Sequence, residues 1–134
     1  MAFVHGKSGY FNLDNPGGTG TDISTYCDDV SFPETIETAE TTAFGATSKS
    51  YIVGLRDATI SISGKWDATL DAVMIGTEPA SRTFMFGPAG STGGLVKYTG
   101  ECILTNYSIS TSVGDVVTWS ADLQVTGNVT RTTF

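Results

Sequence analysis

Two segments of the chain alternate strictly between apolar and polar residues, and this period of two restricts them to β-strands. In the segment 116–126 every second residue is apolar: Val117, Trp119, Ala121, Leu123 and Val125. The segment 56–66 alternates in the same way, with Ala58, Ile60, Ile62, Gly64 and Trp66 on one side. Successive strand side chains point to opposite faces, so each segment predicts a strand with one buried and one solvated face.

Further strands are predicted over 3–13, 26–36, 82–86 and 96–110, where runs of apolar and β-branched residues are bounded by turn residues. The segment 96–110 differs from the others because apolar residues occupy both of its faces. It is therefore either a central strand covered on both sides, or a strand with one face buried against another molecule.

The turn signals agree with these strands. The segment 14–22, DNPGGTGTD, is predicted to be an irregular insertion, because proline and several glycines interrupt regular structure there. Residues 110–115, STSVGD, are typical of a hairpin connection between the last two strands.

A single short helix is predicted over 67–76. Asp67 is a favourable N-cap and Gly76 a favourable C-terminal stop, while Leu70, Val73 and Met74 share one face. The sequence therefore predicts a mainly β fold, an antiparallel β-sandwich or open barrel of about six or seven strands with one helix packed on it. Its 134 residues are expected to form a single domain, 1–134.

The charge balance argues against nucleic-acid binding. Fourteen acidic residues against seven basic ones give a formal net charge of −7, whereas neutralising phosphates requires the opposite sign. No apolar run reaches the roughly 18 residues of a membrane helix. The N-terminus lacks the apolar core of a secretory signal, so we expect synthesis in the cytoplasm and no membrane association.

The chain carries few groups suited to catalysis or metal binding. His5 is the only histidine, no CxxC pair occurs, and the glycine-rich GGTGTD lacks the lysine of a phosphate-binding loop. Cys27 and Cys102 are interpreted as small buried hydrophobic residues rather than a disulfide. We expect no enzymatic activity, no metal and no cofactor.

The segment 37–55 is the least typical part of the chain. Its small, polar, glycine-punctuated sequence predicts a long loop, yet it carries Phe44, Tyr51 and Leu55. A loop of one small domain has no obvious core for so many apolar side chains.

Four stretches resemble the major tail tube proteins of long, non-contractile (siphovirus-type) bacteriophage tails. They are GYFNLD, DISTYCDDVSFPETIETAETTAFG, TSKSYIVGLRDATISISGKWD with its following helix, and the closing VGDVVTWSADLQVTG. The resemblance covers about 9–127 and lies in the order and spacing of these segments rather than in any single motif.

This resemblance implies a virion subunit that forms rings, commonly hexameric, which stack into a hollow tube for genome passage. The inner wall of such tubes is a barrel of strands from every subunit, and the loop after the second strand reaches neighbouring subunits and rings. The implied partners are the protein itself, a tail terminator, a tape measure protein and distal tail proteins, while DNA passes without specific binding.

The expected assembly residues lie in and beside the long loop at about 37–55, which is predicted to be disordered alone and ordered on assembly. The candidate subunit-interface residues are Phe44, Gly45, Tyr51, Ile52, Gly54, Leu55, Arg56 and Asp57. Arg56 and Asp57 either form ion pairs across a subunit boundary or remain in solvent at the start of the strand.

Acidic residues near the predicted second strand are candidates for the channel wall, where carboxylates would repel DNA mildly. They are Asp28, Asp29, Glu34, Glu37 and Glu40. For each of them a position on a solvated outer face is the alternative, because alternation allows only about half to face the channel.

Two other functions fit the same fold class. One is a β-sandwich module on the virion surface that binds carbohydrate or a host surface, which would require exposed aromatic residues around a shallow site. Trp66 and Trp119 are instead predicted to be buried. The other is the inner tube of a contractile injection system, which differs by a surrounding sheath.

Overall fold

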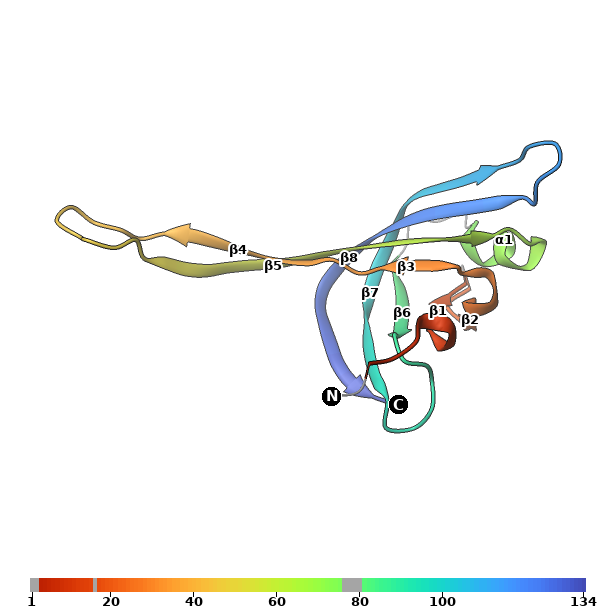
Figure 1. The fold of residues 1–134 in the computed structure, drawn as a ribbon, viewed down its shortest axis with the longest axis horizontal. Coiled ribbons are helices and arrows are strands. Elements are labelled where there is room, and N and C mark those ends of the chain that lie inside the picture. Colours follow the sequence, from red (N-terminus) through yellow and green to blue (C-terminus); the bar gives the residue numbers. More distant parts are fainter. Residues whose placement is uncertain (1–2, 16, 76–80) are drawn as a thin grey trace.

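The computed structural model describes residues 3–15, 17–75 and 81–134, and within them it is built mainly of antiparallel strands (Figure 1). The elements are η1 (Gly6–Ser8), β1 (Tyr10–Asp14), β2 (Gly20–Asp22), η2 (Ser24–Tyr26), β3 (Asp29–Ser31), β4 (Glu34–Glu40), β5 (Tyr51–Lys65), α1 (Ala68–Met74), β6 (Arg82–Gly87), β7 (Val96–Ser110) and β8 (Thr118–Thr133). The mainly β class with one short α-helix is confirmed, with eight strands in the described residues rather than six or seven.

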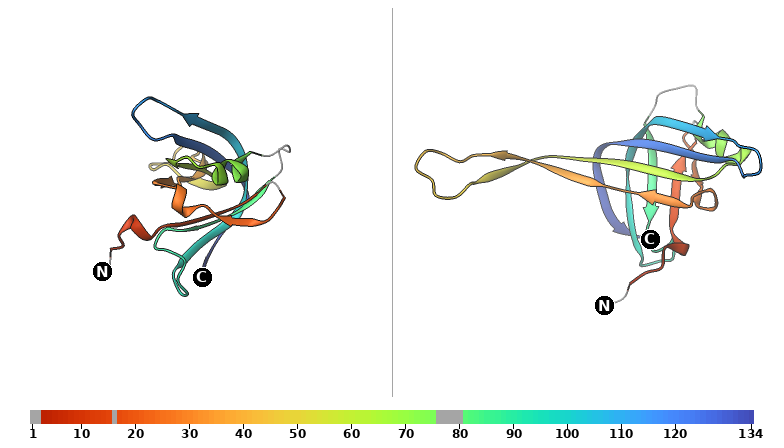
Figure 2. Two further views of the ribbon diagram at one scale, coloured as in Figure 1. Left: turned by 90° about the vertical axis from the view of Figure 1, so that its right-hand side faces the viewer. Right: turned by 45° about the horizontal axis from the view of Figure 1, so that its top comes forward.

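The strands form one open sheet in the order β2-β1-β6-β7-β8-β5-β3, and β4 pairs with β5 outside this path. The long strands β7 and β8 curve, so that β1 and β6 lie in a layer below β5 and α1 (Figure 2). The sheet does not close into a barrel, because its end strands β2 and β3 are not paired with each other.

The core lies between these layers and is filled by the alternating strands, as the sequence predicts. Ile60 of β5 pairs with Leu123 of β8, Ile62 pairs with Ala121, and all four side chains are buried. Phe11 of β1 and Phe84 of β6 close the core from the other layer. Fully burying an aliphatic or aromatic side chain of this size stabilises the fold by roughly 1.5–3 kcal/mol.

The predicted helix is confirmed as α1. The Asp67 carboxylate accepts a hydrogen bond from the Thr69 amide (2.8 Å), and Leu70, Val73 and Met74 are all buried. Gly76, the predicted helix stop, lies outside the described residues.

The C-terminal end of α1 is held by a buried cation that the sequence analysis did not identify. The guanidinium of Arg82, on β6, donates hydrogen bonds to the carbonyl oxygens of Val73 (2.7 Å) and Met74 (3.1 Å). These carbonyls belong to the last turn of the helix, where no intrahelical donor is available. Arg82 therefore fixes α1 to the sheet and satisfies its own charge-assisted hydrogen bonds in the core.

A β-bulge explains why the sequence of β7 carries apolar residues on both faces. The register shifts between Leu104 and Asn106, so that Thr105 is an extra residue opposite β8. Leu104 pairs with the inward Leu123, and after the bulge Tyr107 pairs with the inward Ala121. Tyr107 and Ile109 thus return to the core side, whereas Ile103, opposite Gln124, stays on the outer face.

Four boundaries differ from the sequence prediction. The first strand begins at Tyr10 instead of residue 3, and the last continues to Thr133. The predicted strand 26–36 divides at Pro33 into β3 and β4, because proline cannot donate to the ladder. The predicted irregular insertion 14–22 includes the short strand β2, which pairs with β1.

The two cysteines are free thiols, as predicted. Cys102 is buried on β7, whereas Cys27 follows η2 and is partly buried rather than part of a strand. Burial raises the pKa of each thiol to about 12. Both thiols therefore stay protonated and unreactive at neutral pH.

Candidate functional site

The feature that sets this molecule apart is a long β-hairpin that extends away from the body (Figure 1). We call it the arm: residues 34–57, made of β4, the first part of β5 and the connection 41–50. The prediction that 37–55 is an irregular loop is therefore wrong for 37–40 and 51–55, which belong to β4 and β5. Only 41–50 lies between strands, and its assembly role stays a prediction.

The arm forms a ladder with a β-bulge near its middle. Ile36 pairs with Arg56 and Thr38 with Val53, so β5 has one residue more than β4 between these pairs. Gly54 lies in the bulge, where an added Cβ would come within 3.1 Å of the Glu37 Cβ and carbonyl oxygen. Gly54 therefore has a structural reason to be glycine, as well as its predicted place in an interface.

The arm exposes apolar side chains on both of its faces. The pairing places Ile36, Val53 and Tyr51 on one face, and Ile52 and Leu55 on the other. Ile52 is 58% exposed and Leu55 77% exposed, and Phe44 at the tip is fully exposed. An isolated two-stranded hairpin cannot cover either face itself, and exposed apolar groups in such numbers are typical of an interaction surface.

The backbone edges of the arm are also open. β8 pairs with β5 only as far as the Thr59–Gln124 pair, so in the described residues β4 is the sole partner of β5 within the arm. Open edges of this length favour pairing with another chain. The connection at the tip is nonetheless ordered by its own contacts, with Thr41 and Ser50 hydroxyls 2.9 Å apart and Gly45 at φ +85°.

Arg56 and Asp57 have partners in their own chain at the base of the arm. The Arg56 guanidinium lies 3.7 Å from the Glu34 carboxylate, and both side chains are solvent-exposed. The Asp57 carboxylate accepts a hydrogen bond from the Gln124 amide of β8 (2.7 Å). The hydrogen bond to Asp57 thus connects the base of the arm to the body. The Arg56–Glu34 ion pair is long and exposed, so it contributes little to stability.

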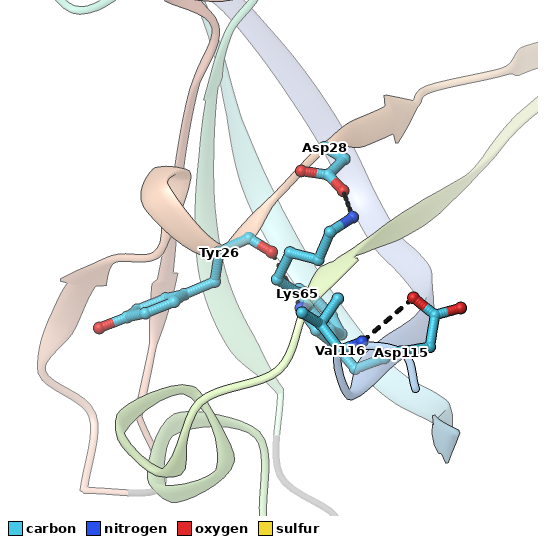
Figure 3. A network of polar contacts seen from close by, with 6 residues as sticks. Tyr26, Asp28, Lys65, Asp115 and Val116 are labelled. Carbon is cyan, nitrogen blue, oxygen red and sulfur yellow. Dashed lines mark hydrogen bonds and ion pairs between the residues drawn. The ribbon is translucent and has the colours of Figure 1, made fainter. Parts of the chain in front are cut away.

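The candidate acidic residues do not converge on one surface. Asp28 accepts a hydrogen bond from the Lys65 ammonium (2.6 Å), which compensates its charge (Figure 3). Asp29 pairs with Ser63 on the side of β3 away from the core. On the arm, Glu34 and Glu40 share one face and Glu37 lies on the other.

The outer face of the sheet, which the sequence analysis did not nominate, is rich in hydroxyl groups. Ser61 of β5 and Asn106 of β7 donate hydrogen bonds to the carboxylate of Asp122, at 3.0 and 3.4 Å. Ser63 and Ser120 face each other across the β5–β8 ladder on the same side. The polar half of the alternating pattern is the signal that marks this face in the sequence.

The described residues show no cluster of three or more histidine, cysteine or acidic side chains that could hold a metal ion. His5 is exposed, and its Nδ1 accepts a hydrogen bond from the Lys7 amide. In the same part of the chain, no helix is both long and apolar enough to cross a membrane.

No protein-family model and no curated protein matches the sequence. Solved structures do match the fold. The tail of an empty gene transfer agent particle with C6 symmetry is 16% identical, with 97% of this chain and 99% of that chain covered at a TM-score of 0.73. The SPP1 tail tube is 12% identical, with coverage of 98% and 80% and a TM-score of 0.75.

The chain has the tail-tube fold. The same fold is seen in the sheath–tube complex of the PVC extracellular contractile injection system, at 11% identity and a TM-score of 0.69. That match covers 98% of this chain and 93% of the other. The resemblance drawn from the sequence is thereby supported at the level of the fold, with the arm and the sheet both included in the matched length.

Proposed function

We propose that this protein is the structural subunit of a phage-type tail tube, which self-assembles into stacked, hexameric rings and forms the conduit for the genome. The observation that carries the proposal is the arm, whose apolar side chains are exposed on both faces of a tail-tube fold. The protein acts without catalysis and is located in the virion tail, after synthesis in the host cytoplasm. Its other partners are the tail terminator, tape measure and distal tail proteins.

Two open strand edges offer a route to ring closure. Among the residues that the structure describes, β3 at one end of the sheet pairs only with β5. On the far side of β7, the ladder with β6 ends at the Arg82–Cys102 pair. In the described residues, β7 from 103 to 110 therefore has only β8 as a neighbour. Placing β3 of one subunit beside β7 of the next continues the sheet around the ring and removes both edges.

In such a ring the hydroxyl-rich outer face of β5, β8 and β7 lines the channel. This face carries serine and threonine hydroxyls with a few carboxylates, and its Lys65 is paired with Asp28, so it offers little positive charge to hold the DNA phosphates. This arrangement is consistent with a net charge of −7 and with passage of DNA without specific binding.

The alternative of a surface binding module has less support. Trp119 is buried, and the indole N–H of Trp66 donates to the Tyr107 hydroxyl (3.0 Å) instead of facing a site. The alternative of a contractile-system inner tube shares the fold, and a sheath around the tube in whole virions would distinguish it.

Electron microscopy of the purified protein tests the proposed function. We expect hollow tubes with a regular axial repeat at high protein concentration. A protein that stays monomeric under all assembly conditions would overturn the proposal.

Neutralising two arm carboxylates tests the channel assignment. In the variant Glu37→Gln with Glu40→Gln we expect normal tubes, but DNA ejection slower by up to about fivefold, since an exposed charge contributes at most about 1 kcal/mol and only one of the two faces of the arm can face the channel. Ejection is followed by dye fluorescence of released DNA from virions that carry the variant. Because Glu37 and Glu40 lie on opposite faces of the arm, the two single variants serve as controls for each other, and an ejection rate equal to wild type in both removes Glu37 and Glu40 from the channel wall.

A further inference from the structure

We propose that the turn between β7 and β8, residues 111–117, inserts into a groove at the base of the arm of a second copy and thereby sets the stacking of subunits along the tube. We call these two surfaces the β7–β8 turn and the arm-base groove. The inference rests on the proposed tube function and names the surfaces that make its axial contact.

The β7–β8 turn carries apolar side chains that its own chain does not cover. Val113 is fully exposed and Val116 is 57% exposed, and Ile109 stands at the start of the turn. Gly114 has φ +85°, a conformation that lets the chain reverse tightly and hold the two valines outward. Such side chains at the tip of a hairpin contribute nothing to the core and fit a contact with another molecule.

The arm-base groove is formed where two strands separate. β5 continues into the arm, whereas β8 leaves it after Gln124 and turns through Gly127, at φ +80°, toward β7. The wedge between them is a groove of about 510 Å³. Its lining includes the aliphatic side chains of Leu55, Val125 and Val129 and the charged side chains of Glu34, Arg56 and Asp57.

The two surfaces are complementary in polarity and hold one pair of opposite charges, while the other charged groups of the groove, the Glu34 and Asp57 carboxylates, contact Arg56 and the Gln124 amide. The groove offers aliphatic side chains for the two valines and one cation, Arg56, whose contact with Glu34 is long at 3.7 Å. The turn offers one anion, Asp115, one of whose oxygens accepts only the adjacent Val116 amide (3.1 Å). Arg56 has five N–H donors, so it can bind Asp115 of another copy without leaving Glu34.

A cation that lies near the turn in its own chain is already bonded. Lys65 extends away to Asp28 at 2.6 Å, while Asp115 turns back toward the Val116 backbone (Figure 3). Asp115 makes no ion pair within the described residues. Its carboxylate is therefore available to a cation from outside the chain.

The positions of the two surfaces lead to an open filament. The arm and the β7–β8 turn extend from the body in opposite directions (Figure 1). A contact between two different surfaces that face opposite ways repeats without closing. The arm of one copy then runs past the inserted turn and lies along the next copy, which covers its apolar faces.

The separation of the two surfaces predicts the axial repeat. β8 runs from Thr118, beside the turn, to Gly127, in the groove, and nine residue steps at ~3.3 Å span ~30 Å. With the length of the turn added, the tube repeat is expected to be about 30–40 Å along its axis.

Charge exchange between Arg56 and Asp115 tests the contact. We expect Asp115→Arg and Arg56→Asp each to lower the sedimentable tube fraction at least tenfold, and the double variant to restore tubes. Glu101→Arg, which makes the same charge change on the body, is the matched control and is expected to assemble as wild type.

Cysteine cross-linking provides an independent readout that does not depend on charge. Val113→Cys and Val129→Cys variants are prepared separately, mixed under assembly conditions and oxidised. A disulfide-linked dimer that requires both variants is expected, because Cys102 is buried, Cys27 is partly buried and both native thiols stay protonated. Mixing Val113→Cys with Ser91→Cys, on an exposed body loop, is the control.

The outcomes separate this inference from the proposed function. Wild-type protein that forms no tubes overturns the proposed function and this inference with it. Wild-type tubes with either charge-swap rescue or the specific cross-link support the contact. Wild-type tubes with neither rescue nor cross-link overturn the contact and leave the tube function standing.

Discussion

Replacing both Ile52 and Leu55 by aspartate is expected to abolish tube formation while leaving the subunit folded. Both side chains are more than half exposed in the single chain, so the substitution removes little from the core. In an assembled tube the same side chains are expected to be covered, and each then contributes roughly 1.5–3 kcal/mol. Replacing each by a buried, unpaired carboxylate removes this gain and adds a desolvation cost of several kcal/mol.

Sedimentation and electron microscopy measure the loss of tubes, and thermal unfolding followed by circular dichroism measures the fold. The matched control is Ser91→Asp with Thr92→Asp, which adds the same charge on an exposed loop of the body. Tubes of normal yield from the Ile52→Asp, Leu55→Asp variant would show that this face of the arm is not an interface.

Gly64→Ala is expected to destabilise the subunit by about 3 kcal/mol or more. A Cβ at Gly64 of β5 would overlap the Tyr26 carbonyl oxygen and crowd the Asp28 amide nitrogen, both of which are backbone atoms. The segment from Tyr26 to Asp28, which lies against Gly64, cannot move away. The Trp119 indole donates a hydrogen bond to the Tyr26 carbonyl (2.9 Å), and the Asp28 amide donates one to the Ser63 carbonyl (2.8 Å). Overpacking at a site held in this way usually costs 1–3 kcal/mol, and backbone overlap costs more.

Urea unfolding of the monomer measures this difference through the midpoint at constant slope. Gly6→Ala is the control, since an added Cβ there meets no atom within 4 Å. A free energy of unfolding for Gly64→Ala within about 0.5 kcal/mol of wild type would contradict the packing described around Gly64.

The parts of the fold that the sequence predicts are those with a local period. The alternation around Ile60 and Leu123 and the i, i+3, i+4 spacing of Leu70, Val73 and Met74 each depend on neighbouring residues alone. Features that depend on distant partners are not visible in this way. Because Thr105 is an extra residue, the side chains of β7 after it lie on the opposite face from the one that simple alternation predicts. Only the pairing with β8 reveals this change.

The arm was missed as regular structure for a related reason. Its strands carry apolar and polar side chains on both faces, so they show no period of two that a single chain could bury. The residues nominated there for an interface are exposed, but the acidic residues nominated for a channel wall are divided between faces. The register of the strand pairing decides on which face of the hairpin each side chain lies, and the bulge at Gly54 shifts the register of this segment.

The preformed arm has a consequence for the kinetics of assembly. A disordered arm would lose about 1–2 kcal/mol of backbone entropy per residue at the moment it docks. A hairpin that is already paired has lost most of that freedom in the monomer, so each docking step onto an existing end is fast and favourable. Elongation is then fast, and the slow step is nucleation, in which enough subunits must associate to form the first tube end. Growth with a lag that shortens steeply with protein concentration, and disappears when tube fragments are added as seeds, is the behaviour that such a subunit should display.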